Sequence, residues 1–244
     1  MSPERERITQ RAQAEPQRRF TALAHHLSEE FLRDTGYGLH RRGAAGVDGQ
    51  TVAAYAADLD AHLADLVARN KRHAYQAPPV RRVFIPKPGQ PDQRRPWGIP
   101  TVEDRLLQAA VARVLSALYE ADFLPVSYGF RPGRSAHQAL TVVRNTGMTG
   151  RAHGVVEADI RGYFDAIDPG WLLRMLALRM GDPWMVRLIR KWLQAGVRED
   201  DQVTTPDAGT PQGHDTLLPG VCRVAAPRIP GTIAGWQHGN HLQQ

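Results

Sequence analysis

The chain has 244 residues, with 31 Lys and Arg against 25 Asp and Glu, a formal net charge of +6 and a single cysteine. One cysteine excludes a disulfide framework, and no Cys/His cluster has the spacing of a zinc site. The sequence has no apolar run of about 18 residues, and its first 19 residues are too polar for a secretory signal. We therefore expect a cytoplasmic protein that has no membrane partner.

The positive charge is almost entirely arginine, because the chain has only three lysines. The planar guanidinium group suits phosphate oxygens. Between Lys71 and Arg105 there are eight basic residues against three acids, threaded through Pro- and Gly-rich turns. This pattern favours a nucleic-acid partner, although a solvated basic face would look similar.

The first part of the chain predicts helices and a loop. Residues 1–42 predict one amphipathic helix after a frayed start, from apolar residues at helical spacing: Phe20, Leu23, Leu27, Phe31 and Leu32. Residues 43–49 are Gly-rich and predict a loop. Thr51 is placed to cap the helix that follows, whose apolar stripe comprises Ala54, Leu59, Leu63 and Leu66.

The middle and the end of the chain alternate strands and helices. Residues 80–85 and 97–99 predict a hairpin with a basic tip, and residues 103–119 predict a helix with a broad apolar face. Ser135 is expected to cap a helix that runs to Val143. Further predictions are a buried strand at 154–160, helices at 171–180 and 183–195, and a short hairpin within 196–208.

Asp159 stands at the end of the predicted strand 154–160. Metal-dependent phosphoryl transfer places a carboxylate at such a position, because a strand end holds it rigidly against the substrate. An N-cap or a turn acid is the alternative for Asp159 taken alone.

Seven segments, in order along residues 43–213, resemble the N-terminal part of a group II intron reverse transcriptase/maturase. They are Ala45-Gly-Val-Asp-Gly-Gln-Thr51, Pro79-Val-Arg-Arg-Val-Phe-Ile-Pro-Lys87, Arg95-Pro-Trp-Gly-Ile-Pro-Thr-Val102, Asp104-Arg-Leu-Leu-Gln108, Ser127-Tyr-Gly-Phe-Arg-Pro-Gly-Arg-Ser135, Ala158-Asp-Ile-Arg-Gly-Tyr-Phe-Asp165 and Gly209-Thr-Pro-Gln-Gly213. The resemblance implies an α+β fold, with right-hand polymerase-type fingers and an incomplete palm, helix-rich with short antiparallel sheets. The implied division is an N-terminal helical extension (1–42), fingers (43–154), a partial palm (155–213) and an aberrant, disordered tail (214–244).

The resemblance also implies an RNA-directed DNA polymerase site. Asp159 and the carbonyl of Ile160 would hold Mg²⁺, with two ions clamping the attacking and leaving oxygens. Phe164 matches the aromatic that favours deoxynucleotides, with a core aromatic as the alternative, and Gln212 matches the residue against the nascent base pair. The triphosphate would be held by three finger residues, for which a solvated basic loop is the alternative: Arg81, Lys87 and Arg95.

Arg131 and Arg134 match the segment of the family that contacts the template. The implied partners are RNA, both intron RNA and template-primer, and deoxynucleoside triphosphates. Backbone and sugar contacts of this kind do not depend on base sequence.

The sequence departs from the family after Gly213, where the Tyr-Ala-Asp-Asp hairpin of the family has no counterpart. Asp200-Asp201 is a weak substitute, because it lies upstream of Gly209 in a polar segment. We therefore expect a truncated chain that is inactive alone and marginally stable. The alternatives are a noncatalytic protein that binds RNA and assists splicing, or a palm and thumb supplied in trans by another polypeptide. Reverse transcriptases of retrons and of diversity-generating elements are further alternatives, but the motifs fit them less well than they fit the intron type.

Overall fold

A long central helix organises the protein. In the computed structural model, which describes residues 3–87, 89–150, 154–158, 167–200 and 202–204, α5 (Val102–Tyr119) carries more of the buried apolar side chains than any other element described. The hydroxyl of Thr101 caps α5 by accepting from the Asp104 amide at 3.2 Å. α1 (Pro3–Ala14) and α2 (Glu29–Gly36) pack against it. The predicted helix at 103–119 is therefore confirmed, together with its role in the core.

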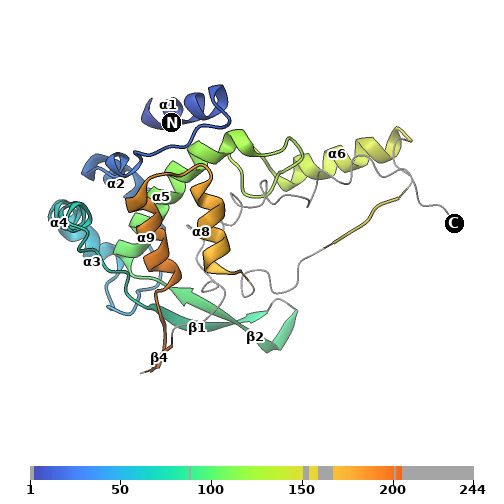
Figure 1. Ribbon diagram of the computed structural model, residues 1–244. Coiled ribbons are helices and arrows are strands. Elements are labelled where there is room, and N and C mark those ends of the chain that lie inside the picture. Colours follow the sequence, from blue (N-terminus) through green and yellow to red (C-terminus); the bar gives the residue numbers. More distant parts are fainter. Residues whose placement is uncertain (1–2, 88, 151–153, 159–166, 201, 205–244) are drawn as a thin grey trace.

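A four-stranded sheet lies at one side of the helices (Figure 1), in the order β2-β1-β3-β4. β1 (Val80–Lys87) and β2 (Gln90–Ile99) form the predicted hairpin, and β3 (Val197–Glu199) and β4 (Gln202–Thr204) form a second one. β3 pairs with β1 in parallel, so the sheet is mixed where short antiparallel sheets were expected. Parallel neighbours need a long connection, and here more than a hundred residues separate the two strands.

The N-terminal segment differs from its prediction. One helix over Phe20–Leu32 was expected, but the structure has α1, a short 3-10 helix η1 (Ala24–His26) and then α2. Phe20 instead pairs with the turn after α8 (Pro169–Ala177): its amide donates to the carbonyl of Arg179 and its own carbonyl accepts from Gly181, both at 2.7 Å. Tertiary hydrogen bonds and the Ser28 cap of α2 therefore override the local helical pattern.

Arg179 fastens the same segment from inside the core. Its side chain is fully buried and lies 3.1 Å from the Asp122 carboxylate. It also donates to three carbonyl oxygens at and beyond the end of α1, those of Ala12, Glu15 and Arg18, at 2.9–3.2 Å. Residues 3–36 therefore share one hydrophobic core with α5, α8 and α9 (Pro183–Leu193).

Side-chain N-caps mark the starts of most of the other helices. Thr51 caps α3 (Val52–Ala57) as predicted, and α4 (Leu59–Lys71) begins after a break at Asp58. Ser135 and Gln138 form a capping box for α6 (Ala136–Met148), which runs past the predicted end at Val143. α8 and α9 are capped by Asp168 and Asp182; both helices were predicted, and they end at Ala177 and Leu193, before the predicted ends at 180 and 195.

The predicted buried strand at 154–160 is wrong over its described part. Residues 154–158 are exposed and form no strand, with Val155 82% and Val156 78% accessible. Within the described ranges no strand pairs with them, and an isolated strand has no hydrogen-bond ladder to stabilise it. The neighbouring helix α6 buries none of its residues and extends away from the core (Figure 1).

Candidate nucleotide and nucleic-acid interface

The three residues predicted to bind the triphosphate lie at different positions along the β1–β2 hairpin. Arg81 pairs with Ile99 at the base, whereas Arg95 pairs with Ile85, and Lys87 pairs with Gln90 beyond a register shift near the tip. Four residues of strand separate Arg81 from Ile85, about 13 Å at ~3.3 Å per residue. The backbone therefore brings Lys87 and Arg95 toward the tip and leaves Arg81 at the base.

The guanidinium of Arg81 is turned to the loop 43–49. Its Nε and one terminal nitrogen both donate to the carbonyl oxygen of Ala45, at 3.0 and 2.7 Å. Arg105, in the first turn of α5, donates to the carbonyl of Ala44 at 2.8 Å. Sequence reasoning assigned Arg105 no role, although it stands inside the matched segment Asp104–Gln108. Two arginines from different elements thus fix adjacent carbonyls of one loop.

Gly46 allows the same loop to pack closely against the start of α5. A Cβ on Gly46 would lie 2.7 Å from both the Cα and the amide nitrogen of Thr101, so only glycine lets the loop approach the start of α5 this closely. The loop, the hairpin base and the N-terminus of α5 therefore form one fixed unit. Beside it, Arg82 makes an ion pair with Glu199 of β3 at 3.4 Å and stays partly open to water.

A buried carboxyl lies beneath this unit. Asp104 Oδ1 accepts hydrogen bonds from the hydroxyl of Tyr75 and from the Trp192 indole, the latter at 3.1 Å. Burial raises the pKa of Asp104 to about 7, and the charge of Asp48 acts in the same direction while the Trp192 hydrogen bond opposes it. Burial also lowers the pKa of Arg105. The Asp104 cluster joins α5, α9 and the segment that enters β1.

The loop before α6 holds the two predicted template contacts. Arg131 is 7% exposed at its side chain, with a 2.7 Å ion pair to Glu120 and donations to the carbonyls of Leu124 and Ser127 at 2.9 and 2.8 Å. Arg134 is exposed and lies over the Tyr128 ring at 5.3 Å. In this geometry Arg131 shapes the loop and Arg134 faces solvent, and the RNA contact of either residue stays a prediction.

Four predicted site residues lie outside the described residues: Asp159, Ile160, Phe164 and Gln212. Among the residues that are described, no group of three or more His, Cys, Asp or Glu could hold a metal ion. Asp200 is exposed in the β3–β4 turn at φ 51°, and Asp201 also falls outside the description. The magnesium site therefore stays a prediction that depends on Asp159.

A basic cavity of about 330 Å³ lies between α1 and the segment 18–26. Ile8, Phe20 and Leu23 form its apolar floor, and its lining includes four arginines and two histidines: Arg7, Arg11, Arg18, Arg19, His25 and His26. The Arg7 and Arg11 side chains are both exposed, one helical turn apart. Sequence reasoning did not single out this cavity, because it forms only when α1 folds back over η1.

Comparison with known proteins identifies the family. Residues 85–217 match the model of the family described as reverse transcriptase (RNA-dependent DNA polymerase), which is more than half of the chain. The chain therefore belongs to the reverse transcriptase family. Such enzymes act on RNA and nucleotides and use divalent metal ions for phosphoryl transfer.

Within that family the chain is similar to group II intron-encoded proteins. It is 43% identical over 143 residues to the group II intron-encoded protein LtrA of Lactococcus lactis subsp. cremoris, covering 59% of this chain and 23% of LtrA. It is 35% identical over 172 residues to protein YkfC of Escherichia coli K12, covering 69% and 44%. The chain thus spans less than half the length of these relatives.

The fold class is also confirmed. The structure is similar to a chain described as "Partial Cas6-RT-Cas1--Cas2 complex", with a TM-score of 0.50 and 23% identity over 83% of this chain and 32% of that one. The helix-rich body with its small sheet agrees with partial reverse transcriptase fingers and palm. No helix of the described ranges is long and apolar enough to span a bilayer.

Proposed function

We propose that the chain supplies the fingers and part of the palm of a group II intron-type reverse transcriptase. One observation carries this proposal: the β1–β2 hairpin, whose base is joined to loop 43–49 through Arg81 and Arg105, lies in and beside the family-matched region. A hairpin fixed at its base can present Lys87 and Arg95 to the phosphates of a deoxynucleoside triphosphate. The main role of Arg81 is then to hold loop 43–49, and a contact with phosphate would be an additional role.

Asp159 and the Ile160 carbonyl would hold magnesium, which supplies charge neutralisation for the transferred phosphoryl group. Phe164 would restrict the sugar, Gln212 would lie against the new base pair, and Arg134 is the exposed template contact, with Arg131 shaping its loop. A complete two-metal site is expected to contain two more carboxylates, and a palm and thumb polypeptide that supplies them in trans is one way to complete it.

Primer extension on an RNA template with Mg²⁺ and deoxynucleotides tests the proposal. The purified chain is compared alone and with a polypeptide that carries the missing palm and thumb of a relative. Extension should appear in the mixture and vanish in Asp159→Asn. Asp200→Asn is the matched control, since it removes the same charge from an exposed turn where Asn tolerates the positive φ. Extension that survives Asp159→Asn would refute the catalytic assignment.

A second candidate is noncatalytic RNA binding that assists splicing. The basic cavity between α1 and residues 18–26 favours it, because this cavity lies outside the region matched by the reverse transcriptase model. Phosphate contacts make such binding strongly dependent on salt. The double variant Arg7→Gln/Arg11→Gln should weaken intron RNA binding, whereas Asp159→Asn should leave it unchanged. Equal binding by both variants would remove the cavity from this role.

A further inference from the structure

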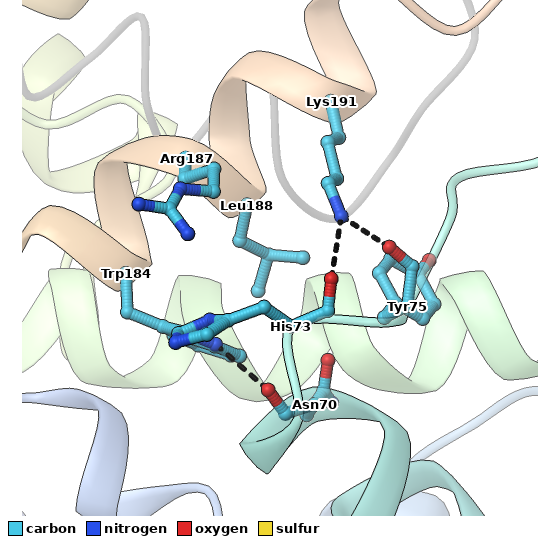
Figure 2. Close-up of a pocket in the computed structure, with 7 residues that line it drawn as sticks. All are labelled: Asn70, His73, Tyr75, Trp184, Arg187, Leu188 and Lys191. Atoms are coloured by element: carbon cyan, nitrogen blue, oxygen red, sulfur yellow. Dashed lines mark hydrogen bonds between the residues drawn. The ribbon is translucent and has the colours of Figure 1, made fainter.

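A second cationic pocket lies on the face formed by the end of α4 and one side of α9, and no function above uses it. Figure 2 shows its seven lining residues, which converge from the α4 C-terminus, the turn after it and α9: Asn70, His73, Tyr75, Trp184, Arg187, Leu188 and Lys191. Three of them are basic and none is acidic. The pocket thus combines local positive charge with lining residues that are fixed by hydrogen bonds.

The wall is held by three hydrogen bonds. The Trp184 indole donates to the backbone carbonyl of Asn70 at 3.0 Å, and the ammonium of Lys191 donates to the carbonyls of His73, at 3.5 Å, and Tyr75 (Figure 2). An ammonium has three donors, so Lys191 keeps one beyond these two bonds. The Arg187 side chain is exposed beside them.

Asn70 provides an independent sign of a ligand. The residue is only 6% exposed, and within the described chain neither its side-chain nitrogen nor its side-chain oxygen has a hydrogen-bond partner. An unsatisfied buried amide is costly, and a water or a ligand atom commonly explains it. The amide lines the pocket, so a ligand oxygen or a water bridging to it would satisfy the missing bond.

His73 lies in the turn that ends α4, at φ 59°. This left-handed conformation is common just after a helix, and hydrogen bonds from the His73 amide to the Asn70 carbonyl and from the Ala74 amide to the Arg69 carbonyl hold the turn. The turn therefore places His73 in the lining of the pocket, next to Asn70.

We propose that this pocket binds a phosphate group of an RNA backbone. The cavity has a volume of about 10 Å³, which is space for one oxygen or one water and not for a base or a sugar. A phosphodiester at the mouth therefore fits better than a free nucleotide, with Arg187, His73 and the remaining Lys191 donor around its oxygens. The inference rests on the proposed function in one respect, that RNA is the partner.

RNA binding by the full chain tests the assignment, with labelled single-stranded RNA followed by fluorescence anisotropy at several salt concentrations. Arg187→Gln should weaken binding about three- to tenfold and lower the salt slope by about 0.7, the value for one phosphate contact on a single strand. Arg190→Gln is the matched control, because Arg190 is an equally exposed arginine on α9 that does not line the pocket. Equal losses in the two variants would overturn the proposal and leave only bulk charge.

His73→Gly separates binding from folding. Glycine relieves the positive φ, so the variant should be at least as stable as the parent, and yet it should bind RNA more weakly. Unchanged affinity would count against the pocket.

A titration with inorganic phosphate distinguishes free phosphate from RNA as the ligand. It also tests the phosphate site separately from the RNA binding that the proposed function requires. The indole N–H resonance of Trp184 should shift at millimolar phosphate while that of Trp171, exposed on α8, stays fixed. RNA should shift Trp184 at much lower concentration. A phosphate shift without RNA binding would refute RNA as the partner, and no shift with either would refute the site. Salt-sensitive RNA binding without a Trp184 shift would leave the proposed function standing and remove this pocket from it.

Discussion

Arg81 of β1 donates two hydrogen bonds to one backbone oxygen, that of Ala45, across 36 residues of chain. A charged side chain thus holds the loop 43–49 against the hairpin base. Arg105 does the same by donating a hydrogen bond to the preceding carbonyl, that of Ala44. Order in the loop therefore depends on Arg105 and on Arg81, to which the family resemblance assigns phosphate binding.

Replacing Arg81 by alanine should loosen the loop. Hydrogen bonds to charged groups contribute about 1.5–3 kcal/mol, so Arg81→Ala should lose an amount in that range from the free energy of unfolding, measured in urea. Hydrogen exchange should accelerate in residues 44–49. Arg82→Ala, the neighbouring arginine with a solvent-accessible ion pair to Glu199, should cost under about 1 kcal/mol. The interpretation fails if the two variants lose equal stability.

The buried Arg179 should be among the most sensitive positions. Arg179→Met removes the partner of Asp122 and three hydrogen bonds to the α1 region, and breaking a buried pair typically costs about 3–5 kcal/mol. Arg174→Met on the preceding helix α8 is the control, because Arg174 is exposed and lies over the Trp171 ring.

Adding Asp122→Asn to Arg179→Met should recover part of the loss, since the largely buried side chain of residue 122 is then neutral. Urea melts of the four proteins give the coupling. Strictly additive losses would show that the ion pair does not stabilise the fold.

Asp104 should make stability depend on pH. Its folded pKa of about 7 lies above the ordinary value of 3.8, so between these pH values the folded state binds more protons than the unfolded state. The Asp104 contribution is therefore fully present below pH 4 and is lost as the pH rises through 7. The stability of the wild type relative to Asp104→Asn should fall between about pH 4 and pH 7, because the variant cannot ionise. A constant difference between the two proteins across that range would contradict the assignment.

Gly46 should tolerate no side chain. A Cβ there meets the backbone of Thr101 at 2.7 Å, and overpacking of this kind costs about 1–3 kcal/mol. Gly129→Ala is the control, because its Cβ would meet nothing within 4 Å and its φ is not in the positive region. Thermal melting of both variants checks the prediction, and an unchanged midpoint for Gly46→Ala would show that the loop moves freely away from α5.

Local patterns in the sequence determined the elements with strong caps or periods. Thr51, Ser135 and the apolar face of residues 103–119 specify their helices through contacts within a few residues, so α3, α6 and α5 are predictable. The motif spacing likewise identifies the reverse transcriptase family, because it depends on residue order alone.

Tertiary structure decided what depends on distant partners. The extended backbone at Phe20 forms because Arg179 and Gly181 pair with it from 159 and more residues away, and residues 154–158 form no strand because no described strand lies beside them. The Arg81–Ala45 contact, the Asp104 cluster and the pocket beside Asn70 all join segments that meet only on folding. Hydrogen bonds and burial across such separations leave no periodic signal in the sequence, so they cannot be read from it.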